Sequence, residues 1–296
     1  MTPDARPVPP PRLAMLQARA ADVAVIFRRG PGRQVELVRW DTARDVFERG
    51  HWFKGRIRHR RCDLSPDGRY LVYFASKITG RTLADTAYTS TWTAISRPPW
   101  LTALALWPKG DHWAGGGLFE DEHTLMLNHA PAQAAPHPAH RPGKKLRVRP
   151  NPRAGGEDDP IYSARLTRDG WELRQEGRTE WGGLYDGFRT TVPEVRRRAH
   201  PDGAPLHVQL TRRLDGYRYR EAFRVRDPDG RDAAELPLGT EWADWDRGGR
   251  LVVLAEGRVR AAAVSPDGRV GPLDVLIDLT DDRFEARVSP PEARRW

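Results

Sequence analysis

One short turn sequence occurs twice in this chain and limits its fold more than any other feature. Ser65-Pro66-Asp67-Gly68-Arg69 is repeated as Ser265-Pro266-Asp267-Gly268-Arg269. Proline fixes φ near the value that such a turn needs, aspartate hydrogen-bonds to its own backbone, and glycine accepts a positive φ. Apolar or alternating segments flank both copies, so each copy predicts a β-hairpin.

Weaker copies of the turn are spread between the two strong ones. They are Arg168-Asp169-Gly170, Leu214-Asp215-Gly216 and Asp227-Pro228-Asp229-Gly230. With 27 Gly and 26 Pro, turns are dense, and 11 Trp, 7 Tyr and 8 Phe supply enough bulk for a core. Repetition of one turn along such a chain indicates an all-β array of similar units. Two unrelated hairpins that share a favourable turn remain the alternative.

The segment Leu64-Ser65-Pro66-Asp67-Gly68-Arg69-Tyr70-Leu71-Val72-Tyr73 resembles the inner hairpin of the WD40-like repeats in TolB-type β-propellers. Residues 245–255 are similar to a divergent copy, with Asp246-Arg247-Gly248-Gly249 in place of the turn. The resemblance implies a single β-propeller over residues 22–296, after a lead-in over residues 1–21. Because a blade takes about 40–50 residues, five blades are favoured over six.

Three segments depart from this regular pattern. Residues 13–21 predict a short N-terminal helix, whereas 161–166 alternate and predict a strand. The Pro- and Ala-rich stretch at about 130–160 predicts a long surface loop around one short strand, 145–149. A two-sheet sandwich, or a pair of small β-domains split near this loop, is the main alternative to the propeller.

Arginine outnumbers lysine by 44 to 5, a skew typical of GC-rich genomes, and the net charge is +9. Alternation within 145–149 would place its three basic side chains on one face, where phosphates bind, and nearby aromatic rings could stack on bases. The alternative is a solvated face of an Arg-rich protein. The residues expected to contact a partner in these two basic clusters are Trp52, Phe53, Lys54, Arg56, Arg58, Arg60 and Arg61, and Lys144, Lys145, Arg147 and Arg149.

A third candidate contact lies in the glycine-flanked segment Glu180-Trp181-Gly182-Gly183-Leu184-Tyr185. Trp and Tyr on loops are common anchors of protein interfaces, so Trp181 and Tyr185 are expected to contact a partner. The fold-level resemblance and these anchors favour a non-enzymatic scaffold that binds a protein. An Arg-driven binder of nucleic acid or another polyanion is the alternative.

Motifs of catalysis are missing from the sequence. It has no Gly-x-Ser-x-Gly elbow, phosphate-binding loop or dinucleotide fingerprint, so no catalytic residue and no cofactor are predicted. Four histidines within 18 residues, His123, His129, His137 and His140, are expected to be exposed rather than to bind a metal. Acids crowd the C-terminal part, so a carboxylate-based hydrolase in the propeller funnel is a second alternative. These acids are Asp244, Asp246, Asp274, Asp278, Asp281 and Asp282.

The remaining signals concern the compartment. A single cysteine, Cys62, cannot form an internal disulfide and is expected to be a small buried apolar residue. The N-terminal residues lack the pattern of a signal peptide, and no apolar run is long enough to span a bilayer. We therefore expect a cytoplasmic protein that does not bind membranes.

Overall fold

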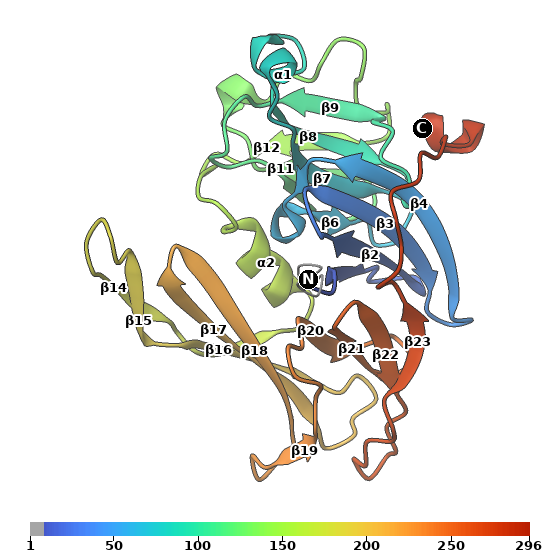
Figure 1. Cartoon of the computed structure of the whole chain (residues 1–296), viewed down its shortest axis with the longest axis vertical. Helices are drawn as coiled ribbons and strands as arrows, with labels where there is room; N and C mark the ends of the chain where they lie inside the picture. The colour runs from blue at the N-terminus through green and yellow to red at the C-terminus, as the bar shows by residue number, and fades with distance from the viewer. Residues whose placement is uncertain (1–8) are drawn as a thin grey trace, which may run out of the picture. The chain divides into compact units, whose positions relative to one another are not determined.

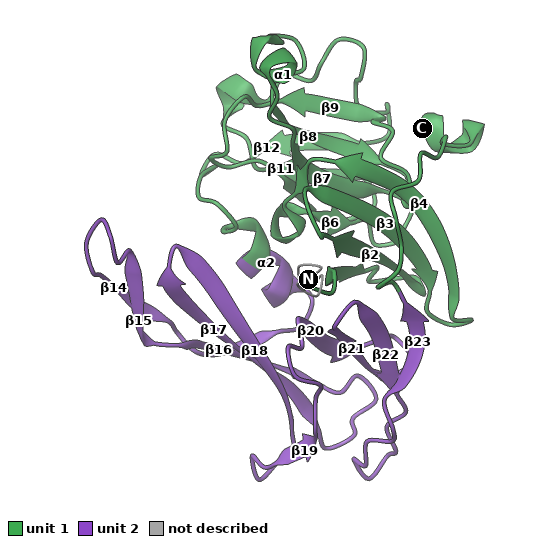
Figure 2. Cartoon of the chain, in the orientation of Figure 1, with its two compact units in different colours: residues 1–162, 279–296 green, residues 163–278 purple. Residues whose placement is uncertain are grey.

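A computed structural model describes residues 9–296. Strands hold 43% of the chain and helices 8%, which confirms the all-β prediction. The chain forms two compact units (Figure 2). Unit 1 contains the described residues up to Tyr162 together with Leu279–Trp296, and unit 2 contains Ser163–Asp278. Unit 2 is therefore an insertion into unit 1, and it begins directly after the Pro-rich stretch. In the part of the chain that is described, a closed ring of five blades is not shown.

Unit 1 contains three sheets (Figure 1). The first is an antiparallel meander of β1 (Arg12–Gln17), β2 (Val23–Arg29), β3 (Gln34–Asp41) and β4 (Val46–Lys54). The second consists of β5 (Arg56–Ile57), β7 (Leu71–Ser76), β8 (Thr91–Ser96) and β9 (Ala105–Pro108), with β6 (Asp63–Leu64) also paired to β7. The third consists of β10 (Gly117–Phe119), β11 (Thr124–Leu127) and β12 (Arg147–Pro150).

Unit 2 contains two sheets. The larger consists of β13 (Glu172–Gln175), β14 (Arg178–Trp181), β15 (Phe188–Val192), β16 (Glu194–Ala199), β17 (His207–Gly216), β18 (Arg218–Arg226) and β19 (Asp232–Ala234). The smaller is a meander of β20 (Trp242–Trp245), β21 (Leu251–Ala255), β22 (Arg258–Ala262) and β23 (Asp274–Asp278). Trp171, Phe223 and Trp242 pack together in this unit, with ring centroids 5.4–6.3 Å apart.

Helical segments are short. They are α1 (Gly80–Ala84), α2 (Ile161–Arg168) and the 3₁₀ turns η1 (His59–Arg61), η2 (Pro131–Gln133) and η3 (Pro291–Arg294). Among residues 9–296 no helix has both the length and the apolar character needed to cross a bilayer.

The second sheet of unit 1 is buried on both faces, and this explains its apolar sequence. Every residue of β7 is buried. Leu71 and Tyr73 pack with residues of the first sheet, whereas Val72, which points the other way, packs with the third. Cys62 is fully buried in the same core, as predicted.

Both strong copies of the repeated turn are closed by the same glycine-to-serine backbone hydrogen bond, but they differ in which N–H binds the serine hydroxyl. The N–H of Gly68 donates to the carbonyl of Ser65 at 2.9 Å, and the Ser65 hydroxyl accepts the N–H of Tyr70 at 2.9 Å. In the second copy Gly268 donates to Ser265 at 2.9 Å, and the Ser265 hydroxyl accepts the N–H of Arg269 at 3.1 Å. The first copy joins β6 to β7 in an antiparallel hairpin, which confirms that prediction.

Two secondary-structure predictions are wrong, and tertiary packing explains both. Residues 12–17 form strand β1 rather than a helix, because Leu13–Leu16 are all buried in a strand that pairs along its length with β2. Four consecutive buried residues suit a strand covered on both faces. The predicted strand at 161–166 is instead helix α2, in which Ile161, Tyr162, Arg165 and Leu166 are buried with helical spacing.

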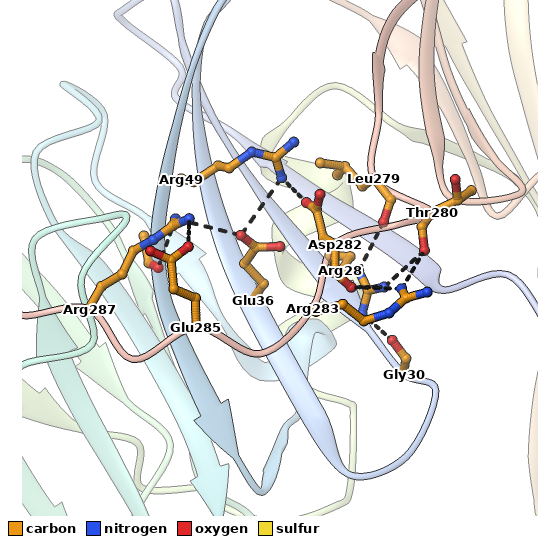
Figure 3. A network of polar contacts seen from close by, with 11 residues as sticks. Arg28, Gly30, Glu36, Arg49, Leu279, Thr280, Asp282, Arg283, Glu285 and Arg287 are labelled. Carbon is orange, nitrogen blue, oxygen red and sulfur yellow. Dashed lines mark hydrogen bonds and ion pairs between the residues drawn. The ribbon is translucent and has the colours of Figure 1, made fainter.

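The returning segment Leu279–Trp296 is bound to the first sheet by arginine side chains (Figure 3). Arg28, on β2, donates from Nε to the carbonyl of Leu279 at 3.1 Å and from a terminal nitrogen to that of Asp282 at 2.9 Å. Its neighbour on β3, Glu36, is 1% exposed. Nitrogens of Arg49 and Arg287 lie 3.9 and 3.8 Å from one Glu36 carboxylate oxygen.

These residues form what we call the Glu36 clamp: Arg28, Glu36, Arg49, Asp282 and Arg287. Burial raises the pKa of Glu36, and the charges of Arg49, Arg287 and Arg28 oppose that rise. Arg49 also pairs with Asp282 in the returning segment. A buried carboxylate is costly unless cations surround it, so the arginines from both chain segments are needed together.

Candidate functional site

Two hairpins of unit 2 end side by side, and this places their turn residues on one surface. In the sheet, Trp181 of β14 lies opposite Phe188 of β15, and Phe188 lies opposite Gly216 of β17. Residues that are directly opposite share a face of the sheet. Tyr217 follows Gly216 in the tight turn to β18, and its ring centroid lies 6.3 Å from that of Trp181.

The resulting surface is the aromatic tip, which we define as Trp181, Leu184, Tyr185, Phe188 and Tyr217. All five side chains are exposed; Leu184 is 82% exposed and Tyr185 is fully exposed. Trp181 and Phe188 meet edge to face with centroids 5.0 Å apart. The predicted exposure of Trp181 is confirmed, but the residue ends strand β14 rather than lying in a loop.

Hydrogen bonds and one close approach hold the tip in shape. The N–H of Gly182 donates to the carbonyl of Gly187 at 2.7 Å, and the Tyr217 hydroxyl donates to the carbonyl of Leu184 at 3.3 Å. A Cβ on Gly187 would lie 2.8 Å from the carbonyl carbon of Gly216, so only glycine allows the two hairpins to approach. The tip is therefore a preformed surface, which reduces the entropic cost of binding.

The tip residues do not serve the fold in the way that core residues do. Burying one large apolar side chain stabilises a fold by about 1.5–3 kcal/mol. Leu184 and Tyr185 are exposed and therefore do not stabilise this fold in that way. Contiguous exposed apolar surface on a soluble protein usually marks a binding site. Sequence reasoning identified Trp181 and Tyr185 but missed Phe188 and Tyr217, because their proximity depends on the pairing of β15 with β17.

The aromatic residues of the first basic cluster are used within unit 1. Trp52 is half-buried and lies 6.1 Å from the ring of Phe284, in the returning segment. The Nζ atom of Lys54 sits 4.1 Å from the same ring. Phe53 packs against the core and meets Trp92 edge to face at 5.8 Å. Trp52 and Phe53 are thus engaged in packing rather than presented for stacking on bases.

The arginines of this cluster occupy different environments. Arg56 is exposed on β5, and Arg58 is half-buried. Arg60 pairs with Asp158 at 3.1 Å and lies over the ring of Tyr162 at 5.2 Å. The cluster therefore does not form one continuous basic surface.

Arg61 is the most deeply buried member, at 2% exposure. One terminal nitrogen donates to the carbonyls of His112 and Ala114 at 2.7 and 2.6 Å, and its guanidinium lies over the ring of Phe74 at 5.1 Å. These contacts shape the loop before β10, so the side chain serves the fold.

The second basic cluster is open. Lys144 and Lys145 are exposed, and in β12 Arg147 and Arg149 are exposed while Val148 is partly buried against the core. The predicted alternation is therefore confirmed for 147–149, whereas Lys145 lies in a turn before the strand rather than in it. Arg149 pairs through two nitrogens with Glu120. Lys144, Lys145 and Arg147 are therefore the basic side chains of this cluster that an anionic partner could contact.

Thr93 and His129 have the geometry of a nucleophile and a base but lie in the interior. Because the carbonyl of Gln133 can only accept, His129 donates to it from Nδ1 at 3.0 Å, and Nε2 accepts from the Thr93 hydroxyl at 2.8 Å. Both residues are 0% exposed, so no substrate reaches them. The expectation of an exposed histidine is wrong for His129, which satisfies a buried hydroxyl instead.

His51 and Ser289 form a second pair of a histidine and a hydroxyl, but here the ring nitrogen that faces the hydroxyl carries the proton. Nδ1 of His51 accepts the N–H of Leu101 at 3.0 Å, and burial lowers the pKa of His51, so the neutral ring carries its proton on Nε2. That nitrogen faces the Ser289 hydroxyl at 3.4 Å and cannot take its proton.

The C-terminal acids are mostly engaged with arginines. Burial raises the pKa of Asp244 to about 6, although Arg198 lies 2.7 Å away. The other close pairs are Asp246 with Arg250 at 2.8 Å, Asp278 with Arg258 at 2.7 Å, and Asp282 with Arg49. Within residues 9–296, no group of three or more His, Cys, Asp or Glu side chains is placed to hold a metal ion.

Comparison with known proteins does not assign the chain to a family. No protein-family model matches it, and no curated protein sequence matches it significantly.

The burial of His129 predicts how stability depends on pH. Burial lowers its pKa from 6.5 to about 4, so between these values the unfolded chain takes up a proton that the folded chain does not. The contribution of His129 to the free energy of unfolding should therefore fall by up to about 3 kcal/mol as the pH drops from about 6.5 to about 4. Denaturant titrations across this range measure the change.

A matched pair of variants isolates this group. His129→Gln should lose less stability than the parent chain as the pH drops from about 6.5 to about 4, whereas His123→Gln, at an exposed position, should follow the parent chain. Identical pH profiles for the parent chain and His129→Gln would show that His129 titrates alike in the folded and unfolded chain.

Proposed function

We propose that this protein is a non-enzymatic scaffold that binds a protein partner through the aromatic tip. The observation that carries the proposal is the high exposure of Leu184 and Tyr185 on a turn held by hydrogen bonds. Aromatic side chains with few rotamers lose little entropy on binding, and they supply the anchors of most protein interfaces. A partner with an apolar surface would bury these rings.

The finer fold proposal is that the meander sheets are blades of a WD40-like, TolB-type β-propeller. Three sheets have consecutive antiparallel strands, as blades do, and the first and second span Arg12–Lys54 and Arg56–Pro108. These lengths are close to the about 40–50 residues of a blade. The repeated Ser-Pro-Asp-Gly turn, which is closed by the same glycine-to-serine backbone hydrogen bond in both copies, also supports this proposal.

Photocrosslinking in the native cell tests the protein-binding proposal. With p-benzoylphenylalanine in place of Tyr185, irradiation should produce a discrete heavier product, because the partner covers this position. Mass spectrometry should find a second, different polypeptide in it. Adding Leu184→Ser should reduce the product at least tenfold, as expected when an interface anchor worth about 1.4 kcal/mol or more is lost.

Leu238 provides the matched control because it is 93% exposed in the same unit but lies outside the tip. The same crosslinker at position 238 should give no such product. Equal products at both positions, or adducts that contain only this chain, would contradict the proposal.

A second candidate function, polyanion binding, rests on the exposed alternation of β12. With Lys144, Lys145 and Arg147 on phosphates, the logarithm of the affinity for a single-stranded oligonucleotide should fall with log salt at a slope of about −2. Arg147→Glu should weaken binding and flatten this slope, whereas Arg231→Glu, at an exposed turn, should not. No binding at low salt would reject this function.

A further inference from the structure

One edge of the large unit 2 sheet is open. β14 is the last strand in the pairing order and pairs with β15; within residues 9–296 no other strand is assigned to it. All four of its residues, Arg178–Trp181, are exposed. An edge strand carries unpaired N–H and C=O groups on its outer side, which can hydrogen-bond to another strand.

The charges on one face of this sheet alternate from strand to strand. Glu180, Arg189, Asp215 and Arg218 lie opposite one another across β14, β15, β17 and β18. The register shift between Arg178 and Thr179 skips a residue of β15, Thr191, and none of β14. Arg178 is therefore placed on the face of Glu180, since residues two apart in a strand point the same way. Among the described residues, neither Arg178 nor Glu180 forms an ion pair. A strand added beside β14 would complete the row with an acid opposite Arg178 and a base opposite Glu180.

β14 itself meets this requirement. When two copies pair antiparallel about a twofold axis at Thr179, Arg178 of each copy faces Glu180 of the other. Thr179 then faces its equivalent, and Trp181 faces Gly177, which leaves room for the indole because it has no side chain. A twofold contact of this kind uses one surface twice and closes on itself.

We propose that β14 is the edge through which two copies of this chain form an antiparallel homodimer. The charge order of Arg178 and Glu180 supports this dimer, because it is complementary to itself only in the antiparallel register centred on Thr179. The pairing adds one strand on each side and covers the open backbone groups. The dimer edge shares Trp181 with the aromatic tip but does not use Leu184 or Tyr185. Dimerisation is measured on the purified chain alone, so its outcome is distinguishable from that of the test for a protein partner at the tip.

Sedimentation equilibrium of the purified full chain, from about 1 μM to about 1 mM, measures the association. The parent chain should show a concentration-dependent monomer–dimer equilibrium. Arg178→Glu and Glu180→Arg should each weaken dimerisation at least tenfold, because each places like charges opposite one another twice. An equimolar mixture of the two variants should dimerise again, since acids on one copy then face bases on the other.

Arg218→Glu is the matched control, on the same face but three strands from the edge, and it should dimerise like the parent chain. All three substituted positions are exposed, and circular dichroism of each variant should match the parent. A parent chain that stays monomeric at about 1 mM would overturn the proposal. Single variants that still dimerise, or a mixture that does not recover, would overturn it as well.

Discussion

The fold depends first on the Glu36 clamp. The chain leaves unit 1 after Tyr162 and returns at Leu279, so unit 1 is complete only when the last 18 residues bind back to its first sheet. Bringing distant segments together costs loop-closure entropy, which specific contacts must offset. Arg28 supplies these contacts to backbone carbonyls, while Arg49 and Arg287 from the two segments lie on either side of one buried carboxylate.

This arrangement separates the residues that hold the fold from those free to bind. Several basic and aromatic residues that could have met a partner are used inside unit 1: Trp52 and Lys54 pack on Phe284, and Arg61 binds loop carbonyls. In unit 2 the rings of Trp171, Phe223 and Trp242 form an interior of their own. The aromatic tip contributes little burial, so a partner can use its whole apolar surface.

Local chemistry explains which features could be predicted from the sequence. The hairpin at Ser65–Gly68 depends on residues within the turn itself, and the alternation at 147–149 lies within one strand. The predictions that failed depend on distant partners. Residues 12–17 are a strand because β2 pairs with them, and 161–166 are helical because buried side chains recur with helical spacing. The neighbours of Trp181 in the tip could not be foreseen, because the pairing of Phe188 with Gly216 joins residues far apart in the chain.

Hydrogen exchange combined with urea unfolding measures directly whether the clamp holds the returning segment. Glu36→Gln removes the buried charge and leaves the arginines facing one another, so unit 1 should lose about 3 kcal/mol of stability. The amides of Leu279–Trp296 should then exchange faster, while those around Trp171 in unit 2 stay protected. Glu285→Gln, at an exposed carboxylate in the same network, should change stability by less than about 0.5 kcal/mol. Equal stability and unchanged exchange of this segment in Glu36→Gln would contradict the role of the clamp.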